Sequence, residues 1–84
     1  QTFVPLGARR FVMVVAAAGA PPGVTALEAF LTGGAQGVTL APGTWHHALL
    51  ALDAGDFVVI ERAAPVVDCV LCALPNAVEL SLAV

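Results

Sequence analysis

Glycine and proline interrupt both of the long uncharged runs of this chain. The first run, Phe11 to Leu27, contains four such residues, and the second, Ala29 to Leu52, contains five. A membrane-spanning helix needs about 20 mostly apolar residues without such breaks. A signal peptide is not indicated either, because strand-like Phe3 to Leu6 lies ahead of Arg9 and Arg10. We therefore expect short strands and no membrane partner.

The chain carries more apolar surface than a domain of its size can bury. Of its 84 residues, 60% are hydrophobic and 11% are charged, against about 45–50% and about 25% in typical domains. A small domain cannot hide this excess, so we expect another protein surface to cover it. The net charge of −3, with three arginines and no lysine, provides no basic patch and argues against a nucleic-acid partner.

Short β-branched and aromatic runs predict a mainly β fold, either a sandwich or a barrel. Gly7 parts the first two runs and predicts a hairpin, and residues 53–56 predict a second hairpin. Pro42 and Gly43 predict a turn. The predicted strands are Phe3–Leu6, Arg10–Ala18, Gln36–Leu40, Trp45–Leu52, Phe57–Arg62, Val66–Leu74 and Ala77–Val84.

One short helix is predicted among these strands. Thr25 and Glu28 have the spacing of a capping box, in which each side chain bonds the backbone amide of the other residue. Apolar residues between Leu27 and Leu31 would form one stripe over about two turns. The glycine pair at 33–34 would end this helix.

Both histidines, the single tryptophan and the acid–base pair Glu61–Arg62 lie between Trp45 and Arg62. Strand alternation places His46 on one face and His47 on the other, so both reach one cavity only if the strand is bulged. Glu61 and Arg62 likewise point to opposite faces. Three structural alternatives stay open for these residues: a hydrogen-bonded histidine, a solvated ion pair, and a tryptophan that packs in the core or at an interface.

The same alternation predicts an interface between subunits. Trp45, His47 and Leu49 share the face away from His46. Together with Phe3 and Val14 on neighbouring strands, they would form an apolar surface that a second subunit covers. This surface accounts for the excess of apolar residues.

The two cysteines, Cys69 and Cys72, form a CVLC motif. Such a pair can be a redox motif or half of a zinc site, but here it follows a predicted strand and lacks a second pair at metal spacing. We interpret both as buried free cysteines, which behave as small apolar residues. Reduced thiols suit a cytosolic location.

The stretch QGVTLAPGTWHHALLALDAGDFVVIER, residues 36–62, resembles the signature region of ureidoglycolate lyases, which reads close to QGVNY, G-x-WHHPL, DF and DR. Upstream, QTFVPLGARRFVMVVA and LEAFLTGGAQGV are similar to other segments of that family. The resemblance runs from Gln1 to about Cys69. The doubled histidine after tryptophan, at this distance from QGV and from DF, is a specific signal. The chain departs from the family pattern at Thr39, Ala48, Glu61 and Ala63–Ala64.

The resemblance implies a cupin, a small antiparallel β-barrel, formed by residues 1–84 as a single domain. Members of the family cleave ureidoglycolate to glyoxylate and urea in allantoin (purine) degradation, and they are usually homodimers in the cytoplasm. The family chain is about twice this length, so the match corresponds to its C-terminal half. The alternative is a non-catalytic cupin remnant that binds a small molecule or serves assembly.

The chemistry of ureidoglycolate indicates which residues would act. One carbon bears a hydroxyl, a carboxylate and a urea nitrogen, so elimination needs a base for the hydroxyl proton, an acid for the departing nitrogen and a cation for the carboxylate. We expect His46, His47 and Glu61 to be catalytic, since imidazole transfers protons near neutral pH. The release of ammonia instead of urea is the alternative outcome.

The expected substrate-binding residues are Arg62, Gln1 and Trp45, with the guanidinium fork of Arg62 on the carboxylate. The resemblance also extends to the second cupin motif, PG-x-x-His, which implies that His46 points into the barrel as a metal ligand. Gln1 stands where the first cupin motif usually has its glutamate. Nickel is associated with the family, so a divalent metal is the cofactor to test, although His46 alone cannot hold one.

Overall fold

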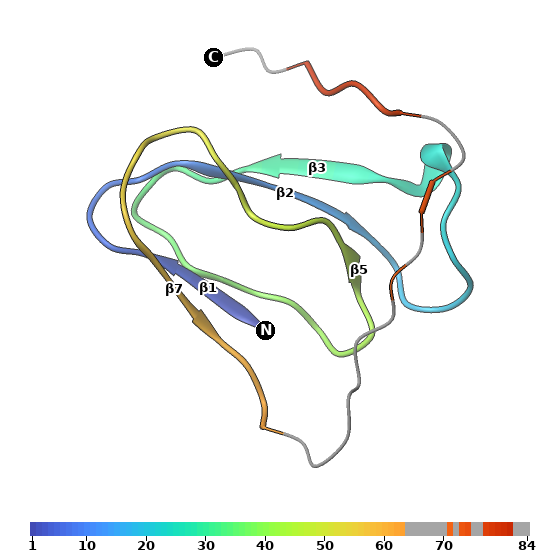
Figure 1. Ribbon diagram of the computed structural model, residues 1–84, viewed down its shortest axis with the longest axis horizontal. Coiled ribbons are helices and arrows are strands. Elements are labelled where there is room, and N and C mark those ends of the chain that lie inside the picture. The colour runs from blue at the N-terminus through green and yellow to red at the C-terminus, as the bar shows by residue number, and fades with distance from the viewer. Residues whose placement is uncertain (64–70, 72, 75–76, 82–84) are drawn as a thin grey trace.

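The computed structural model describes residues 1–63, 71, 73–74 and 77–81. Its regular elements are short strands joined by turns, and one 3₁₀ turn, η1, precedes β3 (Figure 1). The mainly β prediction is confirmed. The elements are β1 (Thr2–Pro5), β2 (Phe11–Ala16), η1 (Val24–Ala26), β3 (Glu28–Leu31), β4 (Val38–Thr39), β5 (Trp45–His46), β6 (Leu50–Ala51) and β7 (Phe57–Ile60).

These strands form two antiparallel sheets. One has the order β4-β1-β7, and the other has the order β3-β2-β5, with β6 also paired to β2. Over the described ranges the two sheets stay open and do not close into a barrel. The antiparallel architecture is as expected, and it fits a small cupin-like β fold.

Both predicted hairpins are wrong. β1 pairs with β4 and β7, whereas β2 pairs with β3, β5 and β6, so the chain changes sheets at Gly7. It changes sheets again between β6 and β7, because β7 returns to β1. Short polar connections predict a turn, but they do not say whether the next strand pairs with the previous one or crosses to the facing sheet.

The predicted helix is also wrong. Residues Glu28–Leu31 form strand β3, and their register runs from Val15 opposite Glu28 to Val12 opposite Leu31. Only the preceding residues, Val24–Ala26, turn helically, and they receive no side-chain cap. All four residues of β3 pair with β2, whereas a helix of about two turns is marginal in water and leaves backbone groups unpaired at both ends.

A small apolar core lies between the inner faces of the two sheets. Phe3 from β1 packs with Phe11 and Met13 from β2, and all three are buried. The ring of Phe57 on β7 meets Phe11 edge to face, with 5.7 Å between ring centroids. Thr32, which is also buried, accepts a hydrogen bond from the Phe11 backbone N–H at 3.1 Å. The core therefore holds β1 and β7 against β2.

The remaining strand predictions concern the end of the chain. Predicted strands Val66–Leu74 and Ala77–Val84 lie partly outside the described residues, and their described members, 71, 73–74 and 77–81, belong to no strand. The interpretation of Cys69 and Cys72 falls outside the described residues. No helix in the described part of the chain has the length and apolarity to cross a membrane.

Arg10 and Asp53 join the start of β2 to the connection that follows β6. Arg10 donates to the Asp53 carboxylate through its backbone N–H at 2.9 Å, through Nε at 3.0 Å and through one terminal nitrogen at 3.1 Å. These hydrogen bonds favour the ionised carboxylate and lower the pKa of Asp53 from 3.8 to about 2.

This pair predicts a pH dependence of stability. Because the pKa of Asp53 is lower in the folded chain, its ionised form stabilises the fold above pH 3.8, and this contribution is lost as the pH falls towards about 2. Asp53→Asn should therefore be less stable than wild type at neutral pH, and the difference should shrink through this acid range. Urea unfolding at several pH values measures this difference in the free energy of unfolding. Asp56→Asn is the matched control, and an equal difference at every pH would contradict the prediction.

Gly37 directly precedes β4 and lies close against β1. A Cβ at Gly37 would lie 3.1 Å from the carbonyl oxygen of Phe3 and 3.4 Å from Cγ2 of Val4. Both of these neighbours belong to β1, and the side chain of Phe3 is part of the buried core.

Gly37→Ala should therefore lower the free energy of unfolding by about 1–3 kcal/mol, the usual cost of overpacking. Gly23→Ala is the control, since a Cβ at Gly23 meets no atom within 4 Å. Its stability should stay equal or rise by about 0.4–1 kcal/mol through the entropy of the unfolded chain. Denaturant titration of both variants tests the contrast, and equal losses would count against it.

Candidate functional site

A β-bulge directly follows His46 and includes His47. His46 pairs with Val15, and Leu50 pairs with Val12. Three residues, 47–49, thus lie opposite two, Met13 and Val14, so one residue is extra. The bulge reverses the alternation after His46, and Leu49 consequently packs against the core. The prediction that Leu49 lies on the outer face with Trp45 is wrong for this reason.

His46 lies on the core side of its sheet, at the open end of the space between the sheets. Its partner Val15 packs against the core, and its ring meets Phe3 at 6.2 Å between centroids and an interplanar angle of 69°. The expectation that His46 is the inward histidine agrees with this placement. Phe3, predicted at a subunit interface, instead lies buried beside His46.

Both ring nitrogens of His46 have hydrogen-bond partners. Nδ1 lies 3.0 Å from the carbonyl oxygen of Thr44, and Nε2 lies 2.7 Å from Oε1 of Gln1. The turn at Pro42-Gly43, confirmed by the structure, places Thr44 at the start of this segment. The ring is therefore held from three sides, by the Thr44 carbonyl, the Gln1 amide and the Phe3 ring.

Gln1 connects His46 to Glu61. Its amide Nε2 donates to the Glu61 carboxylate while its Oε1 faces His46. The β1–β7 register, in which Thr2 pairs with Ile60, places Gln1 directly across from Glu61. Gln1, His46 and Glu61 thus form one hydrogen-bonded group, called here the Gln1–His46–Glu61 cluster. It draws on the ends of three strands.

Other predicted site residues lie outside this cluster. His47 lies in the bulge, where its backbone N–H donates to the carbonyl oxygen of Val14. Its ring Nδ1 lies 3.2 Å from the carbonyl oxygen of Ala48. Trp45 points to the opposite side of its strand and donates to the carbonyl oxygen of Gly19 at 3.1 Å. Arg62 directly follows Glu61 in the chain.

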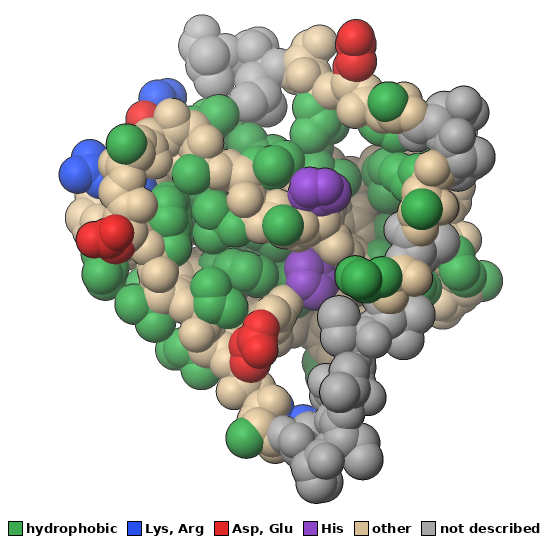
Figure 2. All heavy atoms as spheres, viewed as in Figure 1, with side chains coloured by type: hydrophobic (Ala, Val, Ile, Leu, Met, Phe, Trp, Pro, Cys, Tyr) green, Lys and Arg blue, Asp and Glu red, His purple; other side chains and the backbone are tan. Residues whose placement is uncertain are grey.

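Both histidines are accessible. Figure 2 shows their side chains on the same face of the molecule, among hydrophobic side chains and with an acidic side chain nearby. The histidines are exposed, as are Gln1 and Glu61. A small polar molecule can therefore reach the Gln1–His46–Glu61 cluster from solvent.

The cluster does not complete a metal site with the residues that the structure describes. In that part of the chain, no three side chains of histidine, cysteine, aspartate or glutamate come together. His46 and Glu61 provide one imidazole and one carboxylate, and Gln1 adds a neutral amide oxygen. This donor set is short of the usual four to six ligands of a divalent metal. These residues alone therefore do not fit a divalent metal, and nickel stays a prediction.

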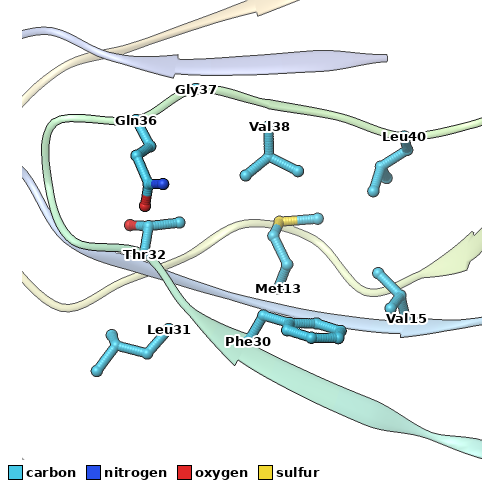
Figure 3. Close-up of a pocket in the computed structure, with 9 residues that line it drawn as sticks. All are labelled: Met13, Val15, Phe30, Leu31, Thr32, Gln36, Gly37, Val38 and Leu40. Carbon is cyan, nitrogen blue, oxygen red and sulfur yellow. The ribbon is translucent and has the colours of Figure 1, made fainter.

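A cleft of about 370 Å³ lies beside the cluster. Residues 36–40, which include β4, line one side of it, and strands β2 and β3 line the other. Figure 3 shows Val38 and Leu40 pointing towards Met13 and Val15. Leu40 donates its backbone N–H to the carbonyl oxygen of Gln1 at 2.9 Å, and Val15 pairs with His46, so this end of the cleft borders the cluster.

The far end of the cleft is polar. Gln36 and Thr32 point towards one another there (Figure 3), and Gln36 accepts a hydrogen bond from the Gly33 N–H at 3.2 Å. Sequence reasoning placed Gln36 in a strand and gave Thr32 no role. The sequence offers one signal for this end of the cleft: Thr32 and Gln36 are polar residues on either side of Gly33, Gly34 and Ala35.

The family model for ureidoglycolate lyase matches residues 1–81. The chain belongs to the ureidoglycolate lyase family. A ureidoglycolate lyase of Burkholderia cepacia is 51% identical and aligns over 82% of this chain and 40% of its own length. Its counterpart in Azotobacter vinelandii is 43% identical over 82% of this chain and 42% of its own length.

The curated relatives of this family member are much longer than the region that aligns with it. A ureidoglycolate lyase of Pseudomonas paraeruginosa is 40% identical over 82% of this chain and 41% of its own length. The chain thus spans about two fifths of the length of these curated relatives. No solved structure matches the chain. The family resemblance inferred from the stretch that contains Trp45, His46 and His47 is confirmed, whereas membership of the cupin superfamily stays a prediction.

Proposed function

We propose that this chain carries catalytic residues of a ureidoglycolate lyase, which cleaves ureidoglycolate to glyoxylate and urea in allantoin degradation. The supporting observation is the Gln1–His46–Glu61 cluster, which brings an imidazole and a carboxylate together in a member of this family. An acid and a base are the groups that the elimination requires.

The reaction itself conserves protons. The O–H bond of the substrate hydroxyl breaks and a C=O bond forms, while the C–N bond breaks and the departing urea nitrogen gains a proton. One group takes a proton and another gives one, so the products are glyoxylate and neutral urea. Two groups in opposite protonation states suit this exchange, and transfer of a proton from the base back to the acid restores the site.

We assign the roles from the contacts. His46 gives the proton to the departing nitrogen, because both of its ring nitrogens face hydrogen-bond acceptors, the Thr44 carbonyl and the Gln1 Oε1. Glu61 takes the hydroxyl proton as a carboxylate. Arg62 is the proposed anchor for the substrate carboxylate, because it directly follows Glu61 in the chain and its guanidinium fork can bind both carboxylate oxygens.

The comparison of the two histidines tests this proposal. In the purified protein, His46→Ala should lower kcat for urea release by about 100-fold or more, the usual contribution of a general acid. His47→Ala should lower it far less, because His47 lies outside the cluster. A coupled assay of urea, run beside an assay of ammonia, measures turnover and identifies the nitrogen product.

A circular dichroism spectrum shows that each variant keeps its strands. Turnover by His46→Ala within about two-fold of wild type would remove its catalytic role. A larger loss in His47→Ala than in His46→Ala would transfer the role to His47. Ammonia in place of urea would reject the lyase assignment.

We propose further that the protein is a cytoplasmic homodimer. The location follows from the proposed role in allantoin degradation. The dimer is supported by exposed apolar side chains, including Phe30 at 54%, Val58 at 40% and Ile60 at 57% of their accessible surface. Val58 and Ile60 lie on the face of β7 opposite Phe57, which packs against the core, so a second subunit could cover them.

Sedimentation at micromolar concentration should show a dimer, because an interface of about 1,600 Å² is a usual size for a stable complex. Ile60→Lys should weaken this dimer if the outer face of β7 forms part of it. Val24→Lys, a similar change at another exposed apolar residue, is the control. A monomer in the wild-type protein would contradict the dimer, and equal effects of both variants would exclude β7 from the interface.

A further inference from the structure

We infer that Gln1 is a positioning residue: its side-chain amide, oriented by Glu61, makes Nε2 of His46 a hydrogen-bond donor. The role of that donor in the reaction rests on the function proposed above. The hydrogen bonds within the cluster, however, are a property of the fold and can be measured without turnover.

The first step concerns the two ends of the amide. A carboxylate only accepts hydrogen bonds, so the Gln1 group that faces Glu61 must be the NH₂ end. The opposite amide orientation would bring two oxygens together. The ionised Glu61 therefore fixes the amide, and the oxygen Oε1 is left facing His46 at 2.7 Å from Nε2.

The second step concerns the ring. Oε1 of Gln1 and the carbonyl oxygen of Thr44 are both acceptors, and they face Nε2 and Nδ1 of His46. Each contact is a hydrogen bond only if the ring nitrogen carries a proton. The ring thus matches these partners when both nitrogens donate. If the amide could turn round, its NH₂ group would donate to a bare Nε2 instead.

The third step links this arrangement to the reaction. The Gln1 amide lies between a hydrogen-bond donor, His46, and a carboxylate, Glu61. Its NH₂ end favours the negative charge of Glu61, and its oxygen favours a protonated Nε2 on His46. The elimination requires an acid and a base at the same time. The substrate nitrogen would then replace Oε1 as the acceptor of the Nε2 proton. Gln1 holds the donor ready and need not touch the reacting atoms.

Nuclear magnetic resonance of the His46 ring tests the inference, because ¹⁵N chemical shifts report whether each ring nitrogen carries a proton. The decisive variant is Glu61→Gln, since a glutamine at 61 can donate or accept and releases the constraint on the Gln1 amide. We expect the Nε2 signal to move from the range of a protonated nitrogen towards that of a bare nitrogen. Glu28→Gln makes the same change on the exposed strand β3 and should leave the signal in place.

A double variant provides the rescue. A glutamate at position 1 accepts from Nε2 without being oriented by its neighbour, and a glutamine at 61 can donate to that glutamate. Gln1→Glu combined with Glu61→Gln should therefore return the Nε2 signal to its wild-type range. An unchanged signal in Glu61→Gln would overturn the inference, and so would a failure of the double variant to restore it.

Kinetics add a separate readout. Gln1→Leu removes both ends of the amide, and we expect kcat for urea release to fall roughly 10-fold or more, with KM within about two-fold of wild type. A change confined to KM would make Gln1 a substrate-binding residue and overturn the positioning role. If wild-type protein releases no urea, the proposed function fails, while the ring signals still decide whether Glu61 and Gln1 orient His46.

Discussion

Strand β2 is hydrogen-bonded along both of its edges, and the positions of the other elements depend on it. β3 covers one edge, and β5 and β6 share the other. Phe11 and Met13 on its inner face form most of the buried core, against which Phe3 and Phe57 pack. His46 takes its position from Val15, and β1 takes its position from the core. β2 therefore positions His46 through pairing with Val15 and positions β1, with Gln1, through the core residues Phe11 and Met13. The Gln1–His46–Glu61 cluster depends on both of these contacts.

The strands that the sequence predicted well are those with long β-branched or aromatic runs, such as β2 and β7. Their side chains fit a pleated surface, whatever the neighbouring strand is. The local spacing of the segment from Thr25 to Leu31 suits a helix and predicts one, although the structure has a strand there. Backbone pairing with β2 outweighs that local preference, and nothing within the segment itself indicates that β2 has a free edge there.

Of the candidate site, the chemical types were predictable but their grouping was not. The sequence predicts His46 and Glu61 because histidine and glutamate suit proton transfer, and it predicts Gln1 as a substrate-binding residue through the family resemblance. Their assembly depends on the register of β1 with β7 and on the crossing of the chain between the sheets. Sequence alternation placed His46 and His47 on opposite faces, but the bulge that follows His46 could not be located from composition or periodicity.

The bulge at residues 47–49 also determines how the chain tolerates changes in length. The pairs on either side of it, His46 with Val15 and Leu50 with Val12, are each held by their own hydrogen bonds. Gain or loss of one residue between them alters only the part of the chain that is already irregular. A change of one residue in length is therefore expected to be tolerated here as long as Leu49 keeps its contact with the core.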